Sequence, residues 1–276
     1  MIPKKIHYCW FGENPMPDKD LENIESWKKF CPDYEIIRWD ESNYDVNKIP
    51  YIKEAYECKK YAFVSDYARL DIIYHEGGIY LDTDVEIIKN IDFLLQNKAF
   101  CGREQNGKIG LGLIFGSESG LPIIKELMEY YHDKHFLDSN GDMNLSPIWK
   151  YTHAVLEPKG CSRNDEFQLI ESMKIYPSCY FDPYDFYTGK PVSKNALKNA
   201  YCIHHYNATW LEKDRQDFLK HSRFLAEKYG VFAYKTGVAQ KLYDFNKNIH
   251  IARKKHKPVY SFFWSIKNTF FIDNYK

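Results

Sequence analysis

The stretch from Ala62 to Glu86 limits the possible folds of this chain more than any other part of its sequence. It reads AFVSDYARLDIIYHEGGIYLDTDVE, so a run with apolar residues at helical spacing is followed by Gly77–Gly78 and the apolar run Ile79–Leu81. We therefore predict a helix, a glycine break and a short buried strand that ends at Asp82 and Asp84. Two carboxylates delivered by a buried strand into a loop form a site for a hard cation, and such a cation commonly carries a diphosphate.

Asp66 and Arg69 share one face of this predicted helix, because they are three residues apart. Such a pair is usually a surface salt bridge that adds little stability. Here the helix ends only a short loop and a strand before Asp82. This proximity favours an interpretation in which Arg69 reaches an anionic ligand and Asp66 accepts a hydrogen bond from a hydroxyl group.

Strands and helices alternate along the first part of the chain, which predicts an α/β fold with a parallel sheet and crossover helices. Strands are expected at 2–10 and 34–39, and helices at 20–30, 52–60 and 61–76. Trp10 and Phe11 follow the first strand, where ligands bind in open α/β sheets. They either form the floor of a nucleobase pocket or pack in the core, and the motif alone does not decide between the two.

Two segments in the middle of the chain have aromatic or glycine-rich sequences. The segment 108–117, KIGLGLIFGS, lacks the glycine spacing of a dinucleotide-binding fingerprint, so we reject a nicotinamide site there. We interpret it as a glycine-rich strand that runs close to a ligand or to another backbone. The segment 181–189, FDPYDFYTG, suits sugar hydroxyls and sugar faces, but tyrosine-rich loops also pack locally.

The late segment AYCIHHYNATW, from Ala200 to Trp210, alternates like a strand. Adjacent side chains of a strand point to opposite sides, so His204 and His205 cannot both reach a metal from one face. At most one of the two histidines is expected at the metal.

Composition narrows the classes of function. With 38 basic and 38 acidic residues the net charge is zero, which argues against a general nucleic-acid-binding protein. The seven cysteines include no Cys-x-x-Cys pair, so we expect a reducing compartment and neither a zinc site nor a disulfide framework. The N-terminus has no signal-peptide pattern and no run of 18 apolar residues occurs, so a cytoplasmic location without a membrane span is expected.

The C-terminal segment 246–276 is strongly basic, with seven lysines and arginines against one aspartate. It also carries an apolar stripe at helical spacing. Such a tail either docks on a membrane surface or a partner, or packs on the domain. We accordingly divide the chain into a domain at 1–245 and a basic, aromatic helical tail at 246–276.

Three motifs in order connect the chain to a known family: the opening IPKKIHYCWFG, the central SDYARLDIIYHEGGIYLDTD and the late HHYNATW. Together they resemble the DXD-containing sugar-nucleotide transferases of glycosyltransferase family 32. These are relatives of the yeast initiating outer-chain mannosyltransferase, of bacterial capsule and lipopolysaccharide transferases and of the catalytic core of the large clostridial glucosylating toxins. The resemblance spans roughly the first 210 residues and is weak in the middle. It implies a GT-A fold, a Rossmann-like mixed sheet flanked by helices, here with a helical C-terminal extension.

The resemblance also implies roles for individual residues. Asp84 would hold Mn²⁺ or Mg²⁺ against the diphosphate, and Asp82 would do so directly or through hydroxyls of the nucleotide sugar. Asp66 would contact the ribose or the donor sugar, and Arg69 would contact the donor. His205, five residues before Trp210, is our choice over His204 for the third metal ligand. Trp210 would contact the leaving diphosphate, and Trp10 and Phe11 would lie by the nucleobase.

The activity implied by this resemblance is that of a metal-dependent, retaining glycosyltransferase. It would move a hexose from a nucleotide sugar, expected to be a UDP-sugar, to a saccharide or lipid-linked oligosaccharide in capsular or other cell-surface polysaccharide synthesis. The enzyme would work in the cytoplasm, peripheral to the inner face of the plasma membrane if the tail docks there. The alternatives are a toxin-like transferase that modifies a protein, and a non-catalytic sugar-binding protein that keeps the fold. No catalytic nucleophile can be named from the sequence.

Overall fold

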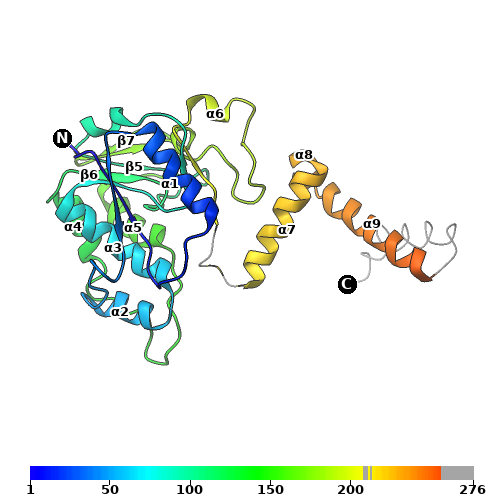
Figure 1. Cartoon of the computed structure of the whole chain (residues 1–276), viewed down its shortest axis with the longest axis horizontal. Coiled ribbons are helices and arrows are strands. Elements are labelled where there is room, and N and C mark those ends of the chain that lie inside the picture. The colour runs from blue at the N-terminus through cyan, green and yellow to red at the C-terminus, as the bar shows by residue number, and fades with distance from the viewer. Residues whose placement is uncertain (208–210, 212, 256–276) are drawn as a thin grey trace. The chain divides into compact units, whose positions relative to one another are not determined.

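The structure is a computed structural model that describes residues 1–207, 211 and 213–255 (Figure 1). The chain divides into two compact units, one within 1–184 and 191–210 and the other within 185–190 and 211–276. The domain boundary predicted at residue 245 falls inside a helix, α9 (Val238–Lys255), which continues across it.

A mixed sheet of seven strands forms the centre of the first unit, in the order β2-β1-β3-β6-β5-β8-β7. Its strands are β1 (Lys5–Cys9), β2 (Glu35–Trp39), β3 (Gly78–Tyr80), β5 (Ala99–Gly102), β6 (Phe115–Ser117), β7 (Gln168–Ile170) and β8 (Met173–Tyr176). β1 runs parallel to β2 and β3, and β5 runs parallel to β8, whereas β6 and β7 run antiparallel to their neighbours. A separate antiparallel pair joins β4 (Val85–Ile87) to β9 (Cys202–His204).

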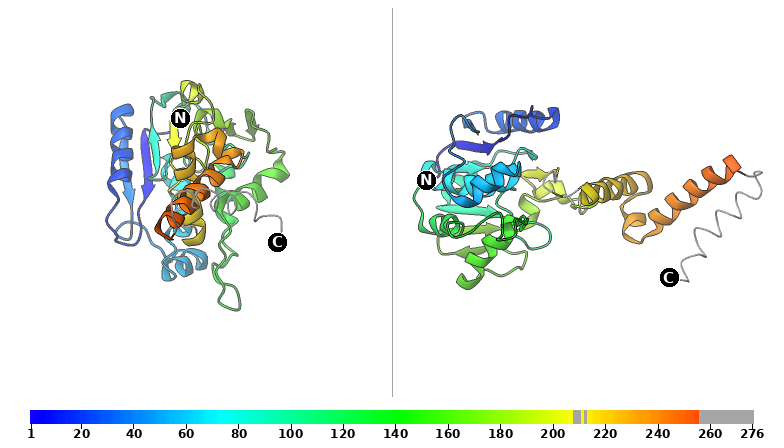
Figure 2. Two further views of the ribbon diagram at one scale, coloured as in Figure 1. Left: turned by 90° about the vertical axis from the view of Figure 1, so that its right-hand side faces the viewer. Right: turned by 90° about the horizontal axis from the view of Figure 1, so that it is seen from below.

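Helices cover the sheet through two apolar clusters. The helices of this unit are α1 (Asp18–Phe30), α2 (Pro50–Glu57), α3 (Tyr61–Glu76), α4 (Pro122–Glu129), α5 (Ile148–Leu156) and α6 (Ala196–Asn199), with 3₁₀ turns η1 (Asp92–Gln96), η2 (Glu157–Lys159) and η3 (Ser178–Tyr180). One cluster is contributed mainly by α2, α3, α4 and α5, and the other by α1, β4 and η1. Figure 2 gives two further views of this arrangement.

The stretch 62–86 folds as the sequence predicts. Helix α3 is buried along most of its length and ends at Gly77, whose φ of 65° is accessible to glycine at little cost. Gly78 has a φ of 102°, and a Cβ there would lie 2.7 Å from the His7 ring. β3 follows between β1 and β6, all three of its residues are buried, and the turn after it carries Asp82 and Asp84.

The predicted α/β fold, with a mixed sheet flanked by helices, is confirmed. Proline and glycine interrupt the regular structure in two places. β8 ends at Tyr176, because Pro177 has no N–H for the sheet, and η3 follows. Helices α8 (Val231–Lys235) and α9 are separated by Gly237, whose φ is 75°.

The second unit is helical. Its first helix, α7 (Lys213–Tyr229), ends at Gly230, and the rings of His221, Phe224 and Tyr243 join it to α9. None of the helices described is both long enough and apolar enough to cross a lipid bilayer.

Candidate metal centre

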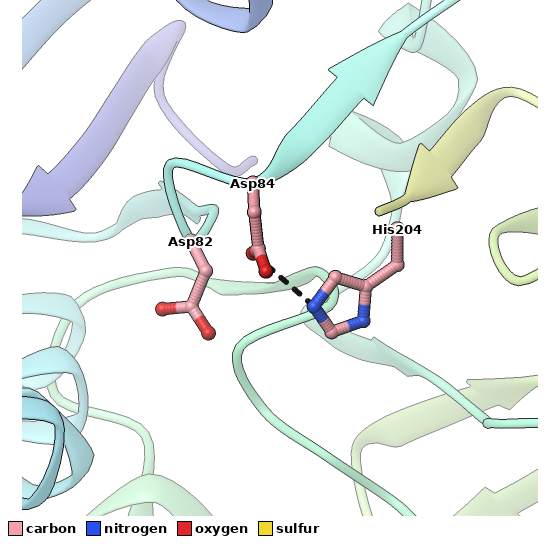
Figure 3. Close-up of side chains that lie close together, drawn as sticks. All are labelled: Asp82, Asp84 and His204. Atoms are coloured by element: carbon pink, nitrogen blue, oxygen red, sulfur yellow. Dashed lines mark ion pairs between the residues drawn. The ribbon is translucent and has the colours of Figure 1, made fainter. Parts of the chain in front are cut away.

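The ends of β4 and β9 bring Asp84 and His204 together (Figure 3). The His204 Nε2 atom lies 3.2 Å from Asp84 Oδ1, and the Asn207 backbone N–H donates to Asp84 Oδ2 at 2.8 Å. Asp82 lies beside this pair, and one ligand atom from each of Asp82, Asp84 and His204 falls within 4.8 Å of the others. Two carboxylates and one imidazole are a donor set that suits Mn²⁺, and the carboxylates also suit Mg²⁺.

The structure brings His204 to the aspartates, and not His205, which the resemblance had favoured. The antiparallel register pairs His204 with Val85, next to Asp84, so the His204 ring points to the aspartates. The His205 ring instead lies with Nε2 3.0 Å from Glu86 Oε2. The choice of His205 is therefore corrected to His204. The sequence alone could not decide between these adjacent strand residues, because the decision depends on the register of the partner strand.

Asp82 and Arg69 form the other half of the site. The Arg69 guanidinium is 4% exposed and lies 3.2 Å from Asp82 Oδ1 and 3.2 Å from Asp66 Oδ1. The Tyr80 hydroxyl also donates to Asp82, at 3.1 Å, and the guanidinium lies 4.8 Å from the centre of the Tyr80 ring. The structure thus brings together Asp66 and Arg69, which the sequence placed on one helix face, and Asp82, which it placed at the strand end.

Burial changes the protonation equilibria of these groups. Burial raises the pKa of Asp66 to about 7, although the charge of Arg69 opposes this shift. Burial alone would lower the pKa of Arg69, but the carboxylates of Asp82 and Asp66 outweigh it and raise the pKa above its usual range. Arg69 therefore stays a fixed positive charge beside the two aspartates.

His204 is similarly controlled by its neighbour. Burial lowers the pKa of His204, but the charge and the hydrogen bond of Asp84 outweigh burial and raise it to about 9. Burial likewise opposes the charged form of Asp84, yet His204 holds the pKa of that carboxyl below its usual value. The pair is a carboxylate and an imidazolium at neutral pH in the absence of a cation.

A second set of polar residues, which the sequence did not single out, holds the aspartate turn from α1. The Thr83 hydroxyl donates to Asp20 at 3.0 Å, and Asn23 donates to the Thr83 carbonyl at 2.8 Å. The Asn207 side chain also donates to Asp20, at 2.8 Å. One sequence signal could have found them, since Asp20 and Asn23 are polar residues on the helix face that also carries the buried Trp27.

The other predicted site residues lie elsewhere or outside the description. Phe11 is buried and its ring packs 5.8 Å from that of Tyr44, while the half-buried Trp10 donates its indole N–H to the Asn14 carbonyl at 2.7 Å. Trp210 lies outside the described residues. The nucleobase and diphosphate contacts of these residues stay predictions. In the aromatic segment 181–189, Phe181 and Asp182 are buried, so neither presents itself to a sugar.

The segment 108–117, predicted to be a strand close to a ligand or another backbone, is a strand only at β6, and at Gly112 it lies against the Asp82 backbone and the side chains of Asp82 and Arg69. The Gly112 carbonyl accepts the Asp82 N–H at 2.9 Å, and an added Cβ would lie 1.8 Å from Asp82 Oδ2 and 2.5 Å from Arg69. Gly112 therefore leaves the space that the Arg69–Asp82 ion pair occupies.

Comparison with known proteins agrees with these features. Residues 17–101, which include the Asp82-Thr83-Asp84 motif, match a family described as "Glycosyltransferase sugar-binding region containing DXD motif". The chain is 32% identical over 160 residues to inositol phosphoceramide mannosyltransferase 3 of Schizosaccharomyces pombe, covering 54% of this chain and 45% of that protein. It is 31% identical over 164 residues to mannosyl phosphorylinositol ceramide synthase SUR1 of Saccharomyces cerevisiae, covering 54% of this chain and 42% of that protein.

The chain thus spans less than half the length of these two curated relatives. Among solved structures, the PaToxG glycosyltransferase aligns with a TM-score of 0.45 at 20% identity, covering 57% of this chain and 70% of that one. Over residues 17–101 the resemblance to the DXD-containing glycosyltransferases is confirmed.

We predict that Gly112→Ala disrupts the site and Gly110→Ala does not. At Gly112 the added methyl overlaps an ion pair that is fixed on both sides, which should cost about 1–3 kcal/mol of unfolding free energy. At Gly110 it meets the end of the Glu104 side chain, which can rotate away. Urea unfolding and Mn²⁺ titration measure both effects, and equal behaviour of the two variants would contradict the assignment of Gly112.

We also predict that divalent-cation affinity rises with pH. A cation bound to His204 must displace its proton, so affinity should increase about tenfold per pH unit from pH 6 and level off near pH 9, the pKa of His204. Calorimetric titration with Mn²⁺ from pH 6 to 9.5 measures this slope. His204→Gln removes the proton and should flatten the profile, whereas a flat profile in the unsubstituted protein would reject His204 as a ligand.

Proposed function

We propose that this chain is a metal-dependent glycosyltransferase that moves a hexose from a nucleotide sugar to an acceptor. The match of residues 17–101 to a glycosyltransferase sugar-binding region supports this proposal. One observation carries the proposal: a three-ligand cation site shares the Asp82 carboxylate with the buried Arg69 guanidinium. A divalent cation and a fixed guanidinium on one carboxylate form a site for an anion with several charged oxygens, such as a diphosphate.

In this proposal Asp84 and His204 hold the cation directly and Asp82 completes the site. When bound, the cation acts as a Lewis acid that stabilises the negative charge on the departing nucleoside diphosphate. Arg69 adds a positive charge whose position is set in advance by Asp66 and Asp82, so it does not need to reorganise during the reaction. We propose that Asp66 accepts a hydrogen bond from a hydroxyl of the donor. As the resemblance implies, the anomeric configuration is retained.

The donor and the acceptor are proposed as classes. The relatives in fungi are named as mannosyltransferases of inositol phosphoceramide, which makes mannose a candidate beside the hexoses of UDP-sugars. The proposed acceptor is a saccharide or a lipid-linked saccharide used in building cell-surface glycans, capsular polysaccharide included. The buried charged groups of the site, whose burial is costly, argue against a non-catalytic protein that only keeps the fold.

We predict that Asp84→Asn lowers the release of nucleoside diphosphate at least about 100-fold, because it removes the carboxylate that pairs with His204. The assay supplies Mn²⁺ with UDP-glucose, UDP-galactose and GDP-mannose in turn. His204→Gln should show a similar loss, and His205→Gln should retain most activity, since its ring lies on Glu86. If the unsubstituted protein neither binds nor cleaves any nucleotide sugar, the proposed function is wrong.

We also propose that the C-terminal helices bind an anionic membrane surface from the cytoplasmic side, which would bring the enzyme to lipid-linked acceptors. Residues 211–276 hold 14 basic and six acidic residues, whereas residues 1–210 hold 24 basic and 32 acidic residues. The rings of Phe218, Phe224 and Phe232 are exposed, the last at 82%. Basic helices with exposed aromatic side chains bind the interface of anionic bilayers.

We predict that the protein sediments with vesicles containing 30% phosphatidylserine at low salt and is released at about 0.5 M salt, where charge interactions are screened. Phe232→Ser should weaken binding, because it removes the most exposed ring of the helical unit. Phe167→Ser, at a 50% exposed ring of the first unit, is the matched control and should have no effect. Equal binding to neutral phosphatidylcholine vesicles, or no binding to either, would reject the proposal.

A further inference from the structure

Asp182 is a buried carboxylate that the proposed reaction does not use. It is 1% exposed and lies beyond the end of β8, in the segment after η3. Its Oδ2 atom accepts hydrogen bonds from the Tyr206 hydroxyl at 2.7 Å and from the Gln105 N–H at 2.9 Å. Its Oδ1 atom is buried and has no hydrogen-bond partner within the part of the chain that the structure describes. Buried carboxylate oxygens are normally bonded, so this free oxygen calls for an explanation.

The His204 ring contains a second buried atom of this kind, a nitrogen. Its Nε2 atom faces Asp84, while its Nδ1 atom is buried and has no hydrogen-bond partner among the described residues. The buried nitrogen of His204 and the buried oxygen of Asp182 belong to one cluster, because Tyr206 contacts both residues.

Tyr206 connects the two groups. Its ring lies 3.9 Å from the His204 ring, at an angle of 31°, and its hydroxyl is held by Asp182. Its backbone has a φ of 52°, a left-handed conformation that is uncommon for a tyrosine. This turn directs the next N–H, that of Asn207, to Asp84. The bond to Asp182 therefore stabilises the local conformation that closes the metal centre.

We infer that Asp182 is a positioning residue of the metal centre, which acts on the cation through His204. It holds Tyr206 against one face of the imidazole, and its Oδ1 atom would accept a hydrogen bond from the Nδ1–H group when Nε2 binds a cation. A ligating histidine commonly donates its second nitrogen to a carboxylate, which fixes the ring orientation and makes the ligating nitrogen more basic. The inference rests on the proposed function only in that the site takes a divalent cation.

Asp182 itself is neither a ligand nor a contact for the substrate. The three side chains whose ligand atoms converge are Asp82, Asp84 and His204, and Asp182 is too deeply buried to reach an acceptor. The competing interpretation is structural, in which Asp182 only fastens the Gln105 loop to the strand end. The two interpretations differ in whether the effect of Asp182 on cation binding requires His204.

The test measures the dissociation constants of Mn²⁺ and Mg²⁺ in Asp182→Asn without any nucleotide sugar. Removing the charge should weaken Mn²⁺ binding about 10–100-fold. Mg²⁺ binding should weaken less, because Mg²⁺ depends on oxygen ligands more than on the imidazole. Asp165→Asn is the matched control. Asp165 accepts hydrogen bonds from the Ser178 N–H at 2.6 Å and hydroxyl at 2.7 Å in the preceding turn, and its loss should leave both constants unchanged.

A double-mutant cycle with His204→Gln separates positioning from structure. If Asp182 acts through His204, then Asp182→Asn has no further effect on Mn²⁺ affinity in the His204→Gln background. The inference is overturned if Asp182→Asn weakens Mn²⁺ binding equally in both backgrounds. It is also overturned if the variant weakens Mn²⁺ and Mg²⁺ binding equally, or if its dissociation constant for Mn²⁺ is unchanged. If circular dichroism shows that Asp182→Asn is unfolded, Tyr206→Phe takes its place, because it removes only the hydroxyl group. This variant should weaken Mn²⁺ binding several-fold.

The outcomes for the inference and for the proposed function can be told apart. Unsubstituted protein that binds Mn²⁺ but cleaves no nucleotide sugar refutes the function and leaves the inference to be judged by the cycle. The inference alone is refuted if the unsubstituted protein cleaves a nucleotide sugar and the Asp182→Asn variant binds Mn²⁺ as tightly as the unsubstituted protein does. Protein that binds no divalent cation refutes both.

Discussion

The ion pairs of Arg69 with Asp66 and Asp82 are the interactions on which the rest of the site depends. A guanidinium that is 4% exposed is costly to bury, and it is tolerated here because two carboxylates lie 3.2 Å away. Removing either aspartate would leave a buried charge without full compensation, which costs more than the ion pair contributes. The same requirement explains the backbone around it, because the pair fits only where Gly112 carries no side chain. Asp82 lies beside Arg69 because it follows β3, the strand between β1 and β6.

Each residue of the Asp-Thr-Asp turn is held by a different element of the fold. Asp82 is paired with Arg69 of α3, Thr83 is bonded to Asp20 of α1, and Asp84 is paired with His204 of β9. Three consecutive residues therefore join three segments that are far apart in the sequence. This explains why the two aspartates differ in character although they are two positions apart. Asp82 shares its charge with a permanent cation, whereas Asp84 faces a histidine that can exchange its proton for a metal ion.

The sequence predicted the parts of this arrangement that are local. The helix, the glycine break and the strand are encoded in one stretch, and the three-residue spacing of Asp66 and Arg69 places them on one helix face beside the strand end. The choice between His204 and His205 depended on the register of β9 against β4, which is a long-range property that no local pattern contains. Asp20, Asn207 and Asp182 were missed for the same reason, because their partners lie 63, 123 and 24 residues away. Phe11 shows the opposite case, since an aromatic residue after a strand suits a base pocket and a core equally well, and its ring packs against Tyr44.

If the proposed function holds, the charges of the site would favour binding of a cation before a diphosphate. Without a cation the carboxylates of Asp82 and Asp84 face the cations of Arg69 and His204, so the four groups are close to neutral. A divalent cation adds two positive charges, and His204 gives up one when it becomes a ligand, so the site gains one net positive charge. Asp66, whose pKa lies near 7, adds a further negative charge only in part at neutral pH. In the proposed function a diphosphate would therefore meet a site that is more positive after cation binding than before it. The Arg69 guanidinium would keep its position during this change, because it is already paired with Asp66 and Asp82.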